Sequence, residues 1–202
     1  EMEVQDVIET DAYDAETMEP LSVLIGDFAA AMDEDNITMR AVKMHFKTGS
    51  GKKPLSKCGF SSTVKYSSVT FEDGEYVLGA PEMVLKERYE TYEAQFKELT
   101  ENGARVLAFG IYDGECGGKP LEQGIVPLGF LRIVNPIRES AKETFSYFAE
   151  QGVDVKVISG DNPLTVSRVA AQAGICNADR YTDASTLRDE DAVKKALLEN
   201  TV

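Results

Sequence analysis

The sequence predicts an α+β fold: an antiparallel sheet flanked by helices over residues 1–122, joined to a partial α/β module over residues 123–202. Two observations predict it. In the first part, short alternating runs bounded by turn residues lie between segments of helical spacing. After Gly118, nearly continuous apolar runs alternate with amphipathic helices, which is typical of a parallel sheet covered on both faces.

The composition indicates a globular chain with an acidic excess. Of 202 residues, 43% are hydrophobic, and 35 Asp and Glu against 21 Lys and Arg give a net charge of −14. This charge repels nucleic-acid phosphates and anionic membrane surfaces, so no nucleic-acid partner is expected. No apolar run reaches the ~18 residues that span a bilayer, which predicts a soluble polypeptide. The three cysteines have no metal-type or redox spacing, and we expect His45 to be an ordinary strand residue.

The first part predicts helices and antiparallel strands. We expect a solvated acidic arm over the first twenty residues and a helix over residues 17–32, where apolar residues recur at i, i+3, i+4 and i+7. Alternating runs and turn residues predict the remaining elements: strands within 39–46, 60–71, 75–80 and 102–114, a turn at Asp73-Gly74, and a helix over 82–101.

The second part predicts a strand over 126–134, a helix over 137–152, a strand over 153–159 and a helix over 163–173. This order is a βαβ unit that continues into one more helix. Because an incomplete parallel sheet leaves unpaired strand edges, we also expect self-association through residues 128–175.

The turn after residue 158 is a candidate phosphate site. Pro163 suits the first helical position, and Asn162 can cap the helix. A helix N-terminus beyond a strand offers free N–H groups to an anion. Ser159 adds a hydroxyl, Gly160 allows close approach, and Asp161 could hold Mg²⁺. An ordinary capped turn explains the same residues without a ligand.

Two motifs of the second part resemble the phosphorylation domain of P-type cation-transporting ATPases. Asn135-Pro136-Ile137-Arg138 is similar to the family's Asp-Pro-x-Arg segment, and Ser159-Gly160-Asp161-Asn162 to its Thr-Gly-Asp-Asn loop. The resemblance implies a Rossmann-like fold of the haloacid-dehalogenase type. It also implies catalytic roles for Ser159, Gly160 and Asp161, magnesium binding by Asp161, and cofactor contacts from Asn135 and Arg138.

The first part resembles the same family's nucleotide-binding domain. "GFSSTVKYSSV" implies that Phe60 stacks on adenine and that Lys65 contacts the phosphates or the purine edge. "YVLGAPEMVL" implies that Gly79 and Ala80 line the site, and "ARVLAFG" that Arg105 reaches the phosphates. Taken singly, each residue also fits a structural role, Phe60 as core and the cations as solvated surface. Nucleotide binding requires that the Phe60 ring be exposed beside a cleft.

The sequence departs from the family pattern at several positions. Leu78 and Ser62 stand where the family often has cations, so we expect weak, adenine-centred ATP binding. "TGSGKK" is not a Walker loop, because Lys53 replaces the required Ser or Thr. The family's phosphorylated Asp-Lys-Thr-Gly-Thr motif does not occur, so the fragment alone should be inactive.

The resemblance therefore implies a cytoplasmic piece of a membrane pump that uses ATP and Mg²⁺. Its partners would be ATP and the remaining phosphorylation, actuator and transmembrane domains. The Leu-Gly-Ala-Pro spelling resembles a bacterial subgroup associated with calcium transport. Two alternatives stay open: a free-standing haloacid-dehalogenase-type phosphatase, which would need an Asp-x-Asp loop after an apolar strand, and a regulatory module that binds no nucleotide.

Overall fold

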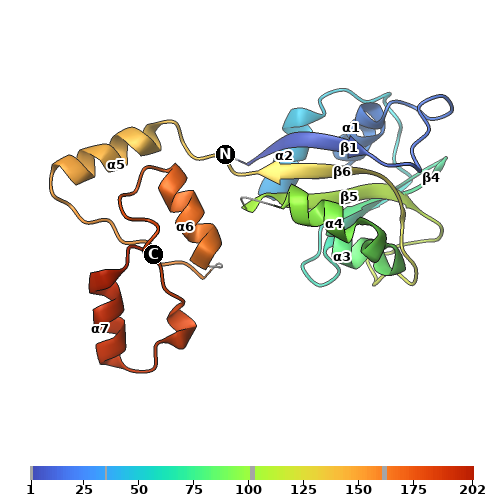
Figure 1. Ribbon diagram of the computed structural model, residues 1–202. Helices are drawn as coiled ribbons and strands as arrows, with labels where there is room; N and C mark the ends of the chain where they lie inside the picture. Colours follow the sequence, from blue (N-terminus) through green and yellow to red (C-terminus); the bar gives the residue numbers. More distant parts are fainter. Residues whose placement is uncertain (1, 35, 101–102, 161–162) are drawn as a thin grey trace. The chain divides into compact units, whose positions relative to one another are not determined.

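The computed structural model describes residues 2–34, 36–100, 103–160 and 163–202. The chain divides into two compact units, residues 1–135 and 136–202, and each is described by itself. The first unit contains one six-stranded antiparallel sheet in the order β1–β6–β5–β4–β3–β2 (Figure 1). Its strands are β1 Glu3–Glu9, β2 Ser56–Cys58, β3 Tyr66–Phe71, β4 Gly74–Gly79, β5 Arg105–Tyr112 and β6 Val126–Val134. The antiparallel sheet predicted from the sequence is therefore confirmed.

Helices cover both faces of this sheet (Figure 1). One face carries α1 and α2, and the other carries α3, the 3₁₀ turn η1 and α4. Their bounds are α1 Leu21–Ala31, α2 Ile37–His45, α3 Pro81–Val84, η1 Lys86–Arg88 and α4 Tyr89–Leu99. The helices predicted over residues 17–32 and 82–101 are confirmed, the second of them as α3 and α4 with η1 between them.

Strand alternation divides the apolar side chains between two cores. Leu78 and Leu131 pack with α1 and α2, whereas their chain neighbours Val77 and Phe130 pack with α3 and α4. Each of these four side chains is at least 96% buried. Fully burying a side chain of this size contributes about 1.5–3 kcal/mol, so both faces of the sheet stabilise the unit.

Two expectations for the first unit were wrong. Residues 39–46 are largely in helix α2 rather than a strand, because the Asn36 side chain accepts a hydrogen bond from Met39 N–H at 2.8 Å and caps it. His45 consequently ends a helix and packs its ring against Phe46 at 4.7 Å. The acidic N-terminal segment is not a solvated arm throughout, since Glu3–Glu9 pairs with β6 as strand β1.

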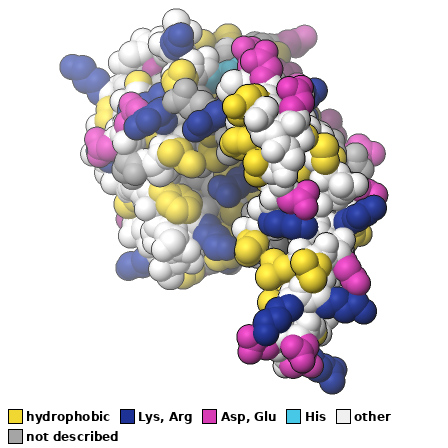
Figure 2. Space-filling model, turned by 90° about the vertical axis from the view of Figure 1, so that its left-hand side faces the viewer, with side chains coloured by type: hydrophobic (Ala, Val, Ile, Leu, Met, Phe, Trp, Pro, Cys, Tyr) yellow, Lys and Arg dark blue, Asp and Glu magenta, His cyan; other side chains and the backbone are white. Residues whose placement is uncertain are grey.

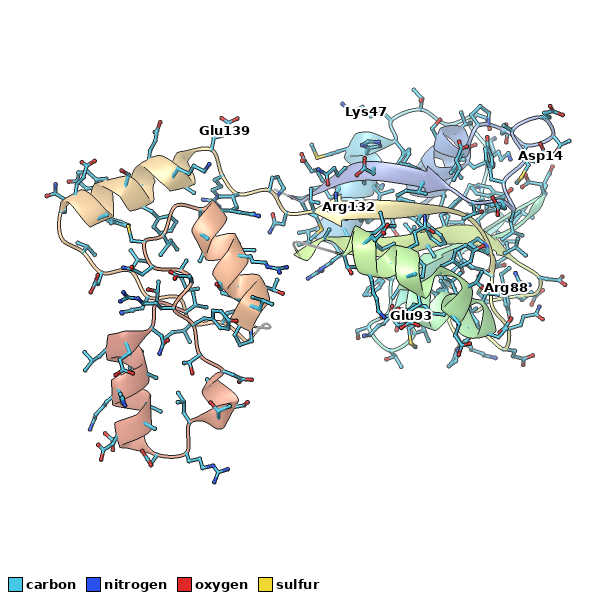
Figure 3. The ribbon with its side chains drawn as sticks, viewed as in Figure 1. Asp14, Lys47, Arg88, Glu93, Arg132 and Glu139 are labelled. Atoms are coloured by element: carbon cyan, nitrogen blue, oxygen red, sulfur yellow. The ribbon has the colours of Figure 1, made fainter. Side chains whose placement is uncertain are left out.

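Strand β6 belongs to the antiparallel sheet and not to a parallel one. It pairs antiparallel with β1 on one side and β5 on the other. Arg132, labelled in Figure 3, adds cross-links: its Nε donates to Leu99 O at 2.8 Å, and its guanidinium lies 3.6 Å from Asp6. The compact units accordingly divide between residues 135 and 136, whereas the boundary expected from the sequence follows residue 122.

The second unit is helical in its described residues. Its elements are α5 Ser140–Glu150, α6 Pro163–Gln172, the 3₁₀ turn η3 Ala184–Thr186 and α7 Glu190–Glu199. The helices predicted over 137–152 and 163–173 are confirmed. The strand predicted over 153–159 does not form. Val157 N–H bonds to Thr201 O at 2.8 Å, but the described residues of 136–202 contain no strand, and the expected parallel sheet is not among them.

These pairings bear on self-association. Residues 128–134 present no free strand edge, because β6 lies between β1 and β5. The unpaired edge that motivated the prediction is therefore not found at β6. Self-association through residues 128–175 stays a prediction. None of the helices in the described part of the chain has the length and apolar character needed to cross a membrane.

Candidate functional site

A pocket of about 540 Å³ lies in the first unit, at the end of the sheet where β3 and β5 begin and β4 and β6 end. A volume of this size is typical of small-molecule sites. Five of the residues singled out from the sequence line it: Phe60, Lys65, Gly79, Ala80 and Arg105. They come from positions far apart in the sequence, and the sheet brings them together.

Strand register explains why these positions meet. Gly79, the last residue of β4, pairs with Tyr66 on β3 and with Ala108 on β5. Just beyond that pair, Ala80 N–H donates to Lys65 O at 2.9 Å and holds the two chain segments together. On the other side, Arg105 opens β5 opposite Ile133.

Gly79 permits a close approach that no other residue would allow. A Cβ atom on Gly79 would lie 2.5 Å from Tyr66 Cβ and 2.7 Å from Lys65 O. Lys65 itself has a left-handed backbone, with φ of 55°, and its N–H donates to Ser61 O at 2.7 Å. The turn that carries Lys65 is therefore fixed by backbone bonds on both sides.

The pocket combines an aromatic ring with two cations. The Phe60 side chain is 49% exposed, so the ring is not sealed into the core, and Lys65 and Arg105 are exposed as well. Figure 2 shows Lys and Arg side chains beside hydrophobic ones on the visible face of this unit. A ring for stacking and cations for anionic groups suit a ligand with an aromatic and a negatively charged end.

Leu78, which stands where the related motif often has lysine, is 4% exposed and belongs to the core as well as to the pocket lining. Its cross-strand neighbours are Ser67 on β3 and Phe109 on β5. Leu78 consequently adds no charge to the pocket, and the positive charge of the pocket comes from Lys65 and Arg105.

The structure also places residues in the pocket that sequence reasoning missed. Asn36, Thr38 and Met39 line it from the start of α2, and Ser67 from β3. The three residues at the start of α2 were missed because residues 39–46 were interpreted as a strand. The N-cap signal of Asn36 before an apolar residue at helical spacing could have revealed that helix.

The remaining predicted residues do not line this pocket. Asn135 and Arg138 are exposed on either side of the boundary between the units. Ser159 and Gly160 line a separate pocket of about 400 Å³ in the second unit. Asp161, the predicted magnesium ligand, lies outside the described residues, as does Asn162. Among the residues that the structure does describe, no group of three or more His, Cys, Asp or Glu side chains could hold a metal ion.

The glycine-rich segment around Gly51 binds a carboxylate of its own chain. Asp27, 2% exposed in α1, accepts hydrogen bonds from Ser50 Oγ at 2.7 Å and from the N–H groups of Gly51 at 2.9 Å and Lys52 at 3.3 Å. Burial alone would raise the pKa of Asp27, but these hydrogen bonds outweigh it and hold the pKa below its ordinary value. The donors that a phosphate loop would offer are thus already used, in agreement with the missing Walker pattern.

Known proteins resemble this chain along most of its length. It is 36% identical over 183 residues to a probable cation-transporting ATPase, exp7, of Streptococcus pneumoniae, a match that covers 88% of this chain and 23% of the relative. It is 31% identical over 175 residues to the calcium-transporting ATPase CtpE of Mycobacterium tuberculosis, covering 86% of this chain and 22% of the relative. The chain thus spans about a quarter of the length of these relatives. No family model matches it.

A solved structure supports the fold. The crystal structure of a zinc-transporting PIB-type ATPase aligns with a TM-score of 0.58 at 15% identity, over 86% of this chain and 26% of that one. At that identity the likeness concerns the fold alone. Sequence and fold together therefore assign this chain to the P-type cation-transporting ATPase family, as a match to one segment of the larger pumps.

Proposed function

We propose that this chain is the nucleotide-binding domain and part of the phosphorylation domain of an ATP-driven cation pump. The observation that carries the proposal is the convergence of Phe60, Lys65, Gly79, Ala80 and Arg105 on one pocket. The sequence motifs alone single out these residues, and nothing in strand packing requires an aromatic ring and two cations to share that pocket.

In this proposal the adenine of ATP stacks on Phe60, and the phosphates extend toward Lys65 and Arg105. Stacking of a nucleobase on an aromatic side chain contributes about 1–3 kcal/mol. The two cations are exposed, so solvent and salt reduce what each one contributes. Leu78 adds apolar contact but no charge, which favours weak binding dominated by the base.

The second unit would take part in phosphoryl transfer to an aspartate outside this chain. Ser159 and Gly160 would help to bind the phosphoryl group, and Asn135 and Arg138 would contact the cofactor. Mg²⁺, held with the help of Asp161, would supply charge neutralisation on the phosphates. We propose that this unit completes a Rossmann-like domain of the haloacid-dehalogenase type with chain that lies outside the present segment.

The pump would lie in a membrane with this segment on the cytoplasmic side, together with actuator and transmembrane domains. Calcium is the proposed ion, because one group of relatives is named for calcium transport and shares 31% identity. The zinc-transporting structure shares the fold at only 15% identity, so it does not favour zinc.

Titration of the chain with ATP by calorimetry, with Phe60→Ala as the test variant, decides the proposal. Loss of stacking should weaken ATP binding by about five- to a hundredfold. Leu55→Ala is a matched control, because Leu55 is 66% exposed in the same unit and does not line the pocket. Unchanged affinity in Phe60→Ala would remove Phe60 from the site. Absence of ATP binding by the unmodified chain would favour a module that binds no nucleotide.

The fragment itself should not hydrolyse ATP, because it lacks the family's phosphorylated aspartate motif. Release of phosphate from ATP or from a generic phosphate ester by the purified chain would instead favour a phosphatase.

A further inference from the structure

Two cysteines that lie far apart in the sequence flank one serine in the first unit. Cys58 on β2 pairs with Ser68 on β3 across the sheet. Cross-strand partners point to the same face, with Cβ atoms about 4.5–5.5 Å apart. The hydroxyl of Ser68 donates a hydrogen bond to the sulfur of Cys116, which lies in the loop between β5 and β6. Both thiols therefore adjoin the side chain of Ser68.

The loop that carries Cys116 also reaches the sulfur of Cys58. A Cβ atom on Gly118 would lie 3.9 Å from Cys58 Sγ. Tyr66 holds this loop, because its hydroxyl donates to Cys116 O at 3.4 Å and to Lys119 O at 2.6 Å. Burial raises the pKa of Tyr66, and the neighbouring thiols of Cys116 and Cys58 raise it further. The two sulfur atoms are thus close enough for a small movement to join them.

The backbone around both cysteines allows such a movement. A disulfide needs its two Cα atoms about 4.4–6.8 Å apart. Strand β2 has only three residues and lies at the edge of the sheet, where β3 is its neighbour. In the loop, Gly114, Gly117 and Gly118 have positive φ, and glycine accepts a wide range of backbone angles. The edge strand and the loop can therefore close onto each other.

The two thiols differ in their access to solvent. Cys116 is 3% exposed, and burial, together with the Glu75 carboxylate, raises the pKa of its thiol to about 12. Because the thiolate is the reactive form, Cys116 is protected from direct attack on a dissolved reagent. Cys58 is half-buried, so a dissolved disulfide can reach it. An exchange reaction therefore begins at Cys58.

A buried carboxylate lies beside the second thiol. Glu75 is 7% exposed and accepts hydrogen bonds from Cys116 N–H at 3.3 Å and from Thr70 Oγ1 at 2.7 Å. It also accepts a hydrogen bond from the Cys116 thiol. A carboxylate in this position can take up the thiol proton as the sulfur attacks.

We propose that Cys58 and Cys116 form a reversible disulfide by exchange with a small dissolved disulfide such as glutathione disulfide. The Cys58 thiolate attacks one sulfur of glutathione disulfide, and the first glutathione leaves. The Cys116 sulfur then attacks Cys58 Sγ, its proton passes to Glu75, and the second glutathione leaves. Each leaving thiolate takes up one proton. Two protein thiols are thus oxidised to one disulfide, while one glutathione disulfide is reduced to two glutathione molecules.

This modification does not depend on nucleotide binding, and its test uses thiol chemistry alone. The folded chain with Cys176→Ser lacks the exposed thiol of the second unit and keeps the pair. After incubation with glutathione disulfide without denaturant, its mass should fall by that of two hydrogen atoms, with no glutathione attached. A proteolytic digest should contain the peptides of Cys58 and Cys116 joined together. Dithiothreitol should restore both thiols.

Two substitutions in the same Cys176→Ser background separate the steps. Cys116→Ser should stop at a mixed disulfide between Cys58 and glutathione, because the thiol that displaces glutathione is then absent. Cys58→Ser should leave Cys116 as a free thiol, because its sulfur is buried. Attachment of glutathione to Cys116 in the Cys58→Ser chain would contradict the assigned order.

A disulfide that fits the folded unit restricts only the unfolded chain. The oxidised chain should therefore unfold in urea at or above the midpoint of the reduced chain, and a lower midpoint would mean that the bond distorts the unit. The proposal is also overturned if both thiols of the Cys176→Ser chain stay free, if glutathione remains attached to Cys58 there, or if the disulfide forms only between two molecules.

Discussion

The carbonyl oxygen of Lys65 lies 2.7 Å from the position that a Cβ atom would take on Gly79, and it accepts a hydrogen bond from Ala80 N–H at 2.9 Å. This hydrogen bond joins the chain just after β4 to the chain just before β3. The residue that accepts it, Lys65, is also a predicted phosphate contact. The backbone is consequently closely packed at this point of the pocket.

Replacing Gly79 by alanine should destabilise the first unit and disturb the pocket together. The added methyl group meets Tyr66 Cβ at 2.5 Å as well as the Lys65 carbonyl, so backbone must move at a cost of about 1–3 kcal/mol. Urea denaturation measures the loss. Gly160→Ala is the control, since a Cβ atom there meets nothing within 4 Å. Equal stability of Gly79→Ala and the unmodified chain would show that the strand ends are not tightly packed.

Replacing Arg105 by alanine should weaken ATP binding by about two- to tenfold and leave AMP binding nearly unchanged. The guanidinium is exposed, so it contributes as a screened charge on the phosphates. The difference between the variant and the unmodified chain should shrink as salt is raised. Lys97→Ala, on the exposed surface of α4, is the matched control. An equal loss for AMP, or a loss independent of salt, would contradict a phosphate contact.

Replacing Asp27 by asparagine should cost about 1–3 kcal/mol of unfolding free energy at neutral pH, because donors of the 50–52 segment lose their carboxylate acceptor. The pKa of Asp27 is lowered in the folded chain. Its contribution to the free energy of unfolding is therefore fully present above the unfolded-state pKa of about 3.9 and is lost as pH falls through the lower folded-state pKa.

Unfolding measured from pH 7 to 2 should show a smaller difference in stability between Asp27→Asn and the unmodified chain at the acidic end. Asp11→Asn, on the exposed N-terminal segment, should show no such convergence. A constant difference down to pH 2 would mean that the carboxylate charge is not involved.

The first unit should fold when produced as residues 1–135 but not as residues 1–122. The shorter chain lacks β6, which lies between β1 and β5 and contributes the fully buried Phe130 and Leu131. Removing it leaves β1 without its β6 partner and β5 paired on one side only, with β4, and it opens both cores. Circular dichroism and a cooperative denaturation transition distinguish the two chains. A cooperative transition in residues 1–122 would contradict the boundary at residue 135.

Local patterns predicted most of the helices and the hairpin of β3 and β4, because each depends on spacing within a few residues. They failed at β1, and they placed β6, whose bounds they predicted, in a parallel sheet. Glu3–Glu9 has little apolar character of its own and becomes a strand only by pairing with Val126–Val134, more than one hundred residues later in the chain. The continuous apolar run of β6 resembles a parallel strand because both faces of this antiparallel sheet are covered by helices.

The sequence predicted those lining residues of the pocket that belong to short motifs. Phe60, Lys65, Gly79, Ala80 and Arg105 were selected by motif resemblance, and strand register brings them together. Ser67 was not predictable, since a serine in an alternating strand shows nothing of its burial or of the face it occupies. Only the pairing of Ser67 with Leu78 places the hydroxyl inside the pocket.

Titration of the ¹⁵N-labelled chain with ATP, followed by amide NMR shifts, tests the central claim most directly. The account predicts saturable shifts concentrated at the amides around Phe60, Lys65, Gly79 and Arg105, with smaller changes at the exposed α7. Shifts that are absent at saturating ATP, or that concentrate away from this end of the sheet, would contradict it.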